Sequence, residues 1–200
     1  TTKANSLPRR SAQTALYHIA EALTRWIAPI LSFTADELWE HLPGEHSGTV
    51  FAAEWYSRLS KMPADGDMGD AFWDTVQDVK SAVNKVLEGA KKDGFVGGSL
   101  AAEVTLFCDE SLMTTLNALG DELRFVLITS AARLAPLSTA NEAITTDVEG
   151  LQVRLAASDG TKCTRCWHHR EDVGQSLAHP ELCFRCIDNV DGDGEVRLYA

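Results

Sequence analysis

Several features are missing from this 200-residue sequence, and each absence excludes a class of protein. No stretch approaches the roughly 18 consecutive apolar residues of a membrane-spanning helix. The polar start of the chain lacks the hydrophobic segment of a secretory signal peptide. Positive charge is also scarce, since 18 lysines and arginines face 29 aspartates and glutamates. We therefore expect a cytoplasmic protein with no membrane partner, and its net charge of −11 argues against non-specific binding to nucleic acid.

Motifs of common catalytic folds are absent as well. The sequence contains no G-x-x-x-x-G-K-[ST] phosphate loop, no G-x-G-x-x-G, no G-x-S-x-G nucleophile elbow and no H-E-x-x-H pair. Carboxylates are plentiful, but no two of them are marked as a general acid and base. The residues favour a binding module that has no catalytic residues of its own.

The acidity is concentrated in the middle of the chain. Residues 63–160 carry a net charge of −9, whereas residues 1–62 are neutral and residues 161–200 carry −2. The first 28 residues hold a local excess of +3. The acidic total is therefore compatible with a specific contact to RNA through a small basic patch at either end.

Four of the five cysteines form two C-x-x-C pairs near the C-terminus, Cys163 with Cys166 and Cys183 with Cys186. Sixteen residues separate the pairs, which is the spacing of a zinc site with four thiolate ligands. A two-residue gap lets both thiolates of a pair point to the same side of a tight turn. Such a site has no open position for an activated water, so we predict one structural Zn²⁺ ion.

Other uses of these cysteines fit less well. Disulfides are disfavoured because no secretory context is visible, and a thioredoxin-like redox pair needs a single C-x-x-C at a strand-to-helix junction. His168, His169 or His179 could replace one cysteine ligand, but the spacing already supplies four, so we expect these histidines to face solvent or RNA. Cys108 lies in an apolar alternation and is predicted to be buried.

The N-terminal part is predicted to be helical. From Ser11 to about Pro29, apolar residues recur every three or four positions and share one helix face: Ala12, Leu16, Ile19, Leu23 and Ile27. We expect this face to pack against a second helix in a bundle.

The second helix is predicted to start at Thr34 and to run to about Leu42. Thr34 and Glu37 have the spacing of a capping box, and Phe33 with Leu38 fits a hydrophobic staple. Pro43 and Gly44 then break the helix.

The middle of the chain predicts a long helix followed by a small α/β unit. The helix buries residues from Phe72 to Ala90 and closes at Gly94, with its charged face in solvent. Strands are predicted at 102–108, near 131–137 and at 151–155, short helices at 112–119 and 121–127, and a loop over 138–149. The fold class is therefore multi-domain and mainly α: a helical region over 1–95, a small α/β junction unit over 96–160 and a four-cysteine zinc knuckle module over 161–200.

Three segments of the sequence resemble the C-terminal part of bacterial isoleucyl-tRNA synthetases. Residues 15–37 are similar to the anticodon-binding helical domain of class I synthetases, and residues 70–126 to the linker helix and junction unit that follow. The third and most specific segment begins C-T-R-C-W-H at Cys163 and looks like the C-terminal zinc peptide, a finger shared with formamidopyrimidine-DNA glycosylases. The resemblance covers nearly the whole chain.

The resemblance implies that the complete protein is isoleucine–tRNA ligase, which charges tRNA(Ile) with isoleucine and consumes ATP. The H-I-G-H and K-M-S-K-S signatures of that class are missing here. We therefore expect the ATP-binding and editing domains upstream of Thr1, and no ligase activity from this region alone. Its share is to bind the anticodon stem and loop as a monomer, with the zinc module supporting that binding.

The residues expected to contact tRNA are basic or aromatic and lie in two places. They are Arg9, Arg10 and Arg25 near the N-terminus, and Arg165, Trp167, His168 and Arg185 around the zinc site. Four of them have a structural alternative. Trp167, Arg165 and Arg185 could pack within the zinc module, and Arg25 could pair with Glu21 one turn away. A zinc-ribbon protein-interaction module that binds no nucleic acid is the alternative function, and it fits the acidity. A DNA-repair glycosylase tail fits less well, because that family needs a catalytic N-terminal proline and a strongly basic groove.

Overall fold

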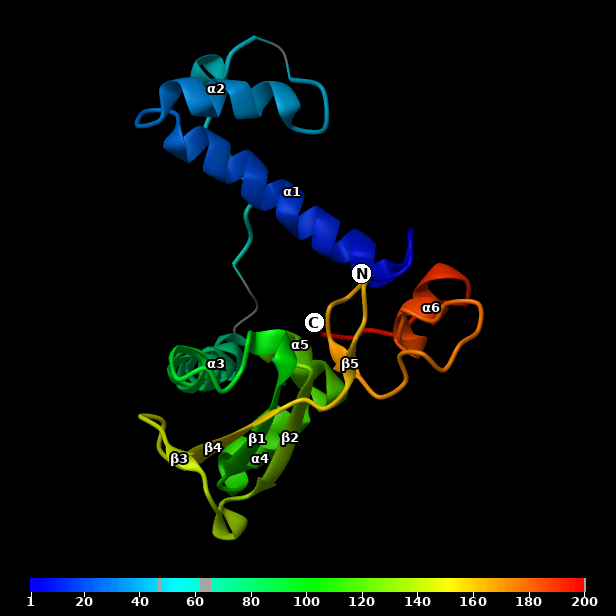
Figure 1. The fold of residues 1–200 in the computed structure, drawn as a ribbon. Helices are drawn as coiled ribbons and strands as arrows, with labels where there is room; N and C mark the ends of the chain where they lie inside the picture. The colour runs from blue at the N-terminus through cyan, green and yellow to red at the C-terminus, as the bar shows by residue number, and fades with distance from the viewer. Residues whose placement is uncertain (47, 62–65, 200) are drawn as a thin grey trace. The chain divides into compact units, whose positions relative to one another are not determined.

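The computed structural model describes residues 1–46, 48–61 and 66–199 (Figure 1). The chain divides into two compact units, Ala4–Met62 and Thr1–Lys3 with Pro63–Ala200. No helix among the described residues is both long enough and apolar enough to cross a membrane.

The first unit contains α1 (Leu7–Ile27), α2 (Ser32–His41) and the short 3₁₀ helix η1 (Val50–Ala52). The first helix begins four residues earlier than the apolar pattern predicts. Ser6 caps it by accepting a hydrogen bond from the backbone N–H of Arg9 at 3.5 Å, and Pro8 fits the first turn because that turn needs no N–H donor.

The predicted start of α2 is wrong. The helix begins at Ser32 and makes no side-chain capping bond, so Thr34 lies inside the first turn. The turn after α1 explains the difference: Leu31 N–H bonds to the Ile27 carbonyl at 2.7 Å, and the Leu31 carbonyl already accepts from Ala35. Phe33 is 94% exposed and forms no hydrophobic staple.

The predicted packing face of α1 is exposed in this unit. Leu16, Ile19 and Leu23 lie largely in solvent, while the buried residues are Glu21, Ala22 and Thr24. The small core of the unit consists of Ala28, Ala35, Trp39 and Val50. Because α2 and η1 cover only one side of α1, the bundle packing expected for the apolar face is not formed within these residues.

The second unit begins with α3 (Asp70–Lys92) and contains a four-stranded sheet of order β2-β1-β4-β3. Its elements follow in the order η2 (Ser99–Ala101), β1 (Ala102–Cys108), α4 (Glu110–Asn117), η3 (Gly120–Glu122), α5 (Leu123–Leu127), β2 (Ala131–Pro136), η4 (Leu137–Thr139), β3 (Ile144–Thr145) and β4 (Leu151–Ala157). Strand β1 pairs parallel with β2 and antiparallel with β4, which in turn pairs antiparallel with β3. The predicted loop over 138–149 therefore contains a short edge strand.

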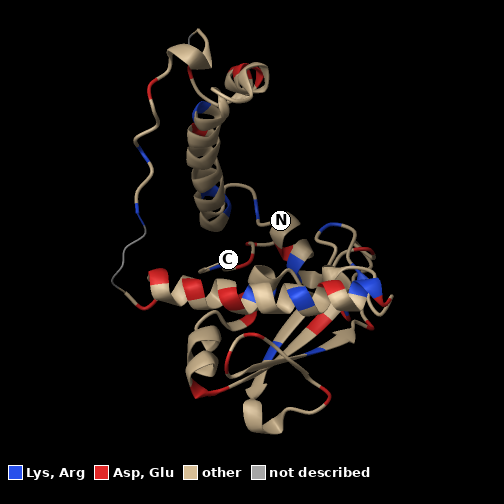
Figure 2. Cartoon of the chain, turned by 90° about the vertical axis from the view of Figure 1, so that its left-hand side faces the viewer, with Lys and Arg blue, Asp and Glu red and all other residues tan. Residues whose placement is uncertain are grey.

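The apolar face of α3 packs into the same core as the sheet. Val76, Val79 and Val83 of α3 are fully buried, as are Val104 of β1 and Val153 of β4. Charged side chains lie along the opposite face of α3, as predicted (Figure 2). Thus α3 packs with the α/β unit, although the sequence places it in the helical region over 1–95; the three-domain division itself stays a prediction.

The C-terminal segment adds a two-stranded sheet, β5 (Thr161–Lys162) and β6 (His169–Arg170), and the helix α6 (Phe184–Val190). A glycine is required where the chain enters this segment, because a Cβ on Gly160 would lie 2.6 Å from the backbone nitrogen of Arg170. The observed helices, small mixed sheet and C-terminal four-cysteine cluster agree with the predicted fold class at that level.

Candidate metal centre and nucleic-acid interface

The four cysteines of the two C-x-x-C pairs converge on one point. Their sulfur atoms all lie within 4.8 Å of one another, and all four residues are buried. Sulfurs bound to one tetrahedral Zn²⁺ at about 2.3 Å lie about 3.8 Å apart. The Sγ atoms of Cys166 and Cys183 are 3.8 Å apart. The cluster therefore fits one zinc ion, and the donor set of four soft thiolates suits that metal.

The backbone of the knuckles turns N–H groups toward the sulfurs. Cys183 N–H points at the Sγ of Cys163 across 3.4 Å. Burial raises the pKa of the Cys163 thiol, but the N–H groups of Cys166, Cys183 and Arg165 outweigh burial and lower the pKa to about 6. Because metal ligation requires the thiolate, these donors favour the ligating form of Cys163.

The apolar core of this module is small. Among the described residues, the apolar side chains that pack against the cysteines are those of Val173 and Leu182, so the four sulfurs themselves form the centre of the module's core. The two knuckles are joined by a backbone hydrogen bond from Thr164 N–H to the Glu181 carbonyl at 3.1 Å. A metal-free module would thus place four buried thiols where a small hydrophobic core should be, so the zinc is structural.

Trp167 follows the first cysteine pair and lies in the left-handed backbone region, with φ of 66°. Its N–H donates to the Cys163 carbonyl at 2.9 Å, which closes the knuckle turn. The side chain is 60% exposed, with the Lys162 ammonium 5.2 Å from the ring centroid. A bulky residue is uncommon in this backbone conformation, and the indole here lies largely in solvent.

Arg165 lies in the first knuckle, between its two cysteines. Its Nη1 donates to the Thr1 carbonyl at 2.5 Å and points at the Sγ of Cys186 across 3.7 Å. Arg165 as a whole is half-buried beside the four cysteines.

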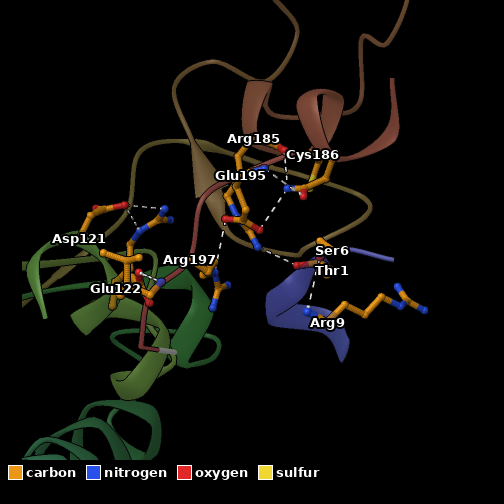
Figure 3. A network of polar contacts seen from close by, with 12 residues as sticks. Thr1, Ser6, Arg9, Asp121, Glu122, Arg185, Cys186, Glu195 and Arg197 are labelled. Atoms are coloured by element: carbon orange, nitrogen blue, oxygen red, sulfur yellow. Dashed lines mark hydrogen bonds and ion pairs between the residues drawn. The ribbon is translucent and has the colours of Figure 1, made fainter. Parts of the chain in front are cut away.

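Arg185, in contrast, is held inside the fold (Figure 3). Its Nε donates to the Glu195 carboxylate at 2.7 Å, and both side chains are only 12–13% exposed. The guanidinium also lies 4.8 Å from the ring centroid of Phe125 in α5. Its Nη2 donates to the Thr1 hydroxyl at 2.6 Å, whereas its buried Nη1 has no hydrogen-bond partner among the described residues.

His168 is buried, unlike the solvent-facing or RNA-facing side chain that the sequence predicts. Its ring packs edge-on against Phe125 with the centroids 5.6 Å apart. Burial, with the nearby charges of Arg124 and Arg185, lowers the pKa of His168 to about 4. The imidazole is consequently neutral at physiological pH.

The three N-terminal arginines differ in their exposure to solvent. Arg9 and Arg10 are exposed in the first turn of α1. Arg25 pairs with Glu21 at 2.7 Å, as the structural alternative expects, and it also contacts the rings of Trp39 and Tyr56. Arg25 is thus built into the small core rather than displayed on α1.

Residues 195–199, which we call the C-terminal strap, tie the zinc module to α5, and no pattern in the sequence predicts this contact. Glu195 pairs with Arg185, and the Arg197 guanidinium lies 3.5 Å from the ring centroid of Phe125. Leu198 and Tyr199 donate their backbone N–H groups to the Glu122 carboxylate. The charged residues of the E-V-R sequence at 195–197 are visible in the sequence. Their partners, Arg185 and Phe125, cannot be predicted from that pattern.

These features define a class: a modular protein with a helical unit, an α/β unit and a closed four-thiolate zinc site, which leaves the metal without a position for catalysis. Residues 1–106 match the family described as "Anticodon-binding domain of tRNA ligase", and residues 160–189 match "Zinc finger found in FPG and IleRS".

The chain is similar over its whole length to curated proteins named "Isoleucine--tRNA ligase". It is 60% identical to that of Alcanivorax borkumensis, 58% to that of Marinomonas sp. and 57% to that of Pseudomonas aeruginosa PAO1. These matches cover 100% of this chain and 21–22% of each relative, so the chain spans about a fifth of their length. The chain belongs to the family of anticodon-binding domains of tRNA ligases.

Proposed function

We propose that this chain is the tRNA-binding part of an isoleucine–tRNA ligase and that it grips the anticodon stem and loop of tRNA(Ile). The supporting observation is the match of residues 1–106 to the anticodon-binding family within a 57–60% identity that spans the entire chain. The complete protein is proposed to join isoleucine to its tRNA with ATP as a monomeric, cytoplasmic class I synthetase. ATP binding and editing belong to domains outside this chain.

Cys163, Cys166, Cys183 and Cys186 are proposed as the four ligands of the structural zinc. When bound, the ion supplies a fixed centre that holds both knuckles in one geometry. Trp167 then lies on the outside of that centre, where an unpaired base could stack on the indole. Arg165 is half-buried beside it and is proposed to meet a phosphate of the same RNA.

The other predicted contact residues divide by exposure. Arg9 and Arg10 are accessible and are proposed to bind backbone phosphates. His168, Arg185 and Arg25 are enclosed by protein groups, so their proposed contribution to tRNA binding is to position the elements that carry the exposed contacts.

A titration with two tRNAs tests this function. The zinc-loaded chain is mixed with tRNA(Ile) and, separately, with an unrelated elongator tRNA, and binding is followed by fluorescence anisotropy over a range of salt concentrations. We expect tighter binding of tRNA(Ile), with an affinity that falls as salt rises. Equal affinity for both tRNAs, or no binding, would reject the proposal and favour the protein-interaction module.

A further inference from the structure

The four-cysteine cluster is buried and, when it holds zinc, negatively charged. Four thiolates carry twice the charge of one Zn²⁺ ion, so the loaded centre is an anion. Cys163, Cys183 and Cys186 are each at most 1% exposed, which keeps water away from most of this charge. A buried net charge is costly unless hydrogen bonds or an opposite charge compensate it. The residues around the cluster must therefore supply that compensation.

Backbone N–H groups face three of the sulfurs. The N–H of Cys183 points at the Sγ of Cys163 across 3.4 Å and so links the two knuckles. Further N–H groups face Cys163, Cys166 and Cys183; they belong to Cys166 and Arg165, to His168, and to Cys186, respectively. These donors are neutral dipoles, so they stabilise the thiolates but leave the net charge of the centre unchanged.

The Sγ of Cys186 faces a charged donor. Nη1 of Arg165 points at this sulfur across 3.7 Å and also donates to the Thr1 carbonyl at 2.5 Å. Arg165 lies in the first knuckle and Cys186 in the second, so the contact crosses from one knuckle to the other. A hydrogen bond from a cation is stronger than one from a neutral amide. Both contacts use Nη1, so the phosphate contact proposed for Arg165 falls to its other nitrogens.

The two knuckles share the pattern C-x-R-C, but their arginines have different partners. Arg185 of the second knuckle pairs with the Glu195 carboxylate at 2.7 Å, which neutralises its charge (Figure 3). Arg165 of the first knuckle has a carbonyl and a sulfur as partners, and no carboxylate in the described part of the chain forms an ion pair with it. The positive charge of Arg165 therefore lies uncompensated beside the thiolates.

We propose that Arg165 is a positioning residue of the metal centre, which holds Cys186 in place as a ligand and offsets the negative charge of the four thiolates. The inference rests on the proposed four-cysteine zinc site and extends it to a residue that does not bind the metal. The guanidinium stabilises the anionic loaded centre more than the metal-free cysteines, so its loss weakens zinc binding.

Competition with a chromogenic zinc chelator measures this contribution in the full chain. Arg165→Met keeps a long side chain but removes the charge and the N–H groups, whereas Arg165→Lys keeps the charge. We expect Arg165→Met to lower the zinc affinity about 10- to 100-fold and Arg165→Lys to recover part of that loss. Lys162→Ala is the matched control, because it removes the same charge from an exposed position next to Cys163 and is expected to bind zinc as the wild type does.

Cobalt absorption separates a contact with the sulfur from a general loss of structure. Co²⁺ binds in place of zinc in thiolate sites, where its d–d bands report tetrahedral geometry and its thiolate-to-metal charge-transfer band reports the electron density on sulfur. We expect Arg165→Met to keep the d–d bands. The charge-transfer band should move to longer wavelength, because a thiolate without the cation gives up an electron more readily. A variant that had lost its fold would lose both kinds of band.

The outcomes separate this proposal from the zinc site on which it rests. An unchanged zinc affinity or an unmoved charge-transfer band in Arg165→Met overturns the role of Arg165 and leaves the zinc site standing. No recovery in Arg165→Lys, or an equal loss in Lys162→Ala, also overturns it. A wild-type chain that binds Co²⁺ without tetrahedral d–d bands, or does not bind it, overturns both the zinc site and the role of Arg165.

Discussion

Arg185 and Glu195 form a 2.7 Å ion pair between the zinc module and the C-terminal strap, and neither side chain is more than 13% exposed. The guanidinium simultaneously faces the ring of Phe125 in the α/β unit. One arginine therefore connects the α6 helix, the strap and α5, which explains how a module with a very small core keeps its position on the sheet domain.

Replacing Arg185 is expected to destabilise the chain, because it removes the 2.7 Å partner of the buried Glu195 carboxylate and leaves the longer contact with Arg197 Nε at 3.4 Å. Removing one partner of a buried pair costs up to about 3–5 kcal/mol, and the remaining contact with Arg197 reduces that cost. Thermal unfolding of Arg185→Ala checks this prediction. The double variant Arg185→Ala/Glu195→Ala is expected to recover part of the loss, and a double variant as unstable as the sum of the two single variants would contradict the pairing.

Arg165→Ala is expected to act differently from Arg185→Ala. Arg165 is half-buried beside the metal centre, so its loss should weaken tRNA binding and reduce the dependence of affinity on salt by about one phosphate contact. Salt titrations of both variants, performed well below their unfolding temperatures, distinguish a charge contact from a loss of fold. An unchanged salt slope in Arg165→Ala would exclude the phosphate contact.

Chelation of zinc is expected to unfold the C-terminal module and to leave the helices and the sheet folded. The four thiols form the centre of the module's core, and small four-thiolate modules fold with their metal. Amide exchange localises the loss of protection, with loss over residues 161–199 and retention in β1 and α3 as the expected pattern. Retained protection in the module after verified removal of the metal would contradict a structural role.

Cysteine alkylation provides an internal control in the same experiment. The four clustered cysteines should react only after chelation, whereas Cys108 should stay unmodified in both states. Cys108 is 2% exposed, and burial raises the pKa of its thiol to about 11. Modification of Cys108 would show that chelation had also opened the α/β unit.

Trp167→Gly is expected to weaken tRNA binding without impairing the folding of the first knuckle. Glycine adopts a φ of 66° without a steric penalty, so the variant should retain zinc and unfold at an equal or higher temperature. The same change removes the exposed indole, and tRNA binding should weaken by about 5- to 100-fold. Loss of zinc together with loss of binding would instead assign the indole a packing role.

Acid should weaken the first unit through Glu21. Because the folded pKa of this carboxyl lies below the ordinary value of 4.5, its stabilising contribution is complete above pH 4.5 and is lost as the pH falls through the folded pKa. Glu21→Gln is expected to destabilise α1 at pH 7 by about 1–3 kcal/mol, with a smaller difference from wild type at low pH. Amide exchange in α1 checks this, and Glu37→Gln, at an exposed position of α2, is the control.

The sequence predicted those parts of the structure that are determined by residues close together in the chain. The apolar repeat of α3 and the alternation of β1 correspond to buried faces, and two C-x-x-C pairs predict a tetrahedral cluster from spacing alone. The wrong predictions concern residues whose conformation or burial depends on other residues that the local sequence pattern does not include. The capping box predicted at Thr34 does not form, because a backbone turn after Ile27 starts the helix at Ser32. The apolar face of α1 is exposed, because no other element of this unit packs against it among the described residues. His168 looked surface-exposed because Phe125, which buries it, is distant in the sequence.

Exchange of anticodon arms between two tRNAs tests most directly whether this chain binds the anticodon stem and loop. The anticodon stem and loop of tRNA(Ile) is moved into an unrelated elongator tRNA, and the reverse exchange is made in tRNA(Ile). The affinity of the zinc-loaded chain for each chimera is then measured at one fixed salt concentration. We expect the affinity to follow the anticodon arm, so that the unrelated tRNA gains the binding that tRNA(Ile) loses. Affinity that stays with the acceptor arm and body of tRNA(Ile) would contradict it.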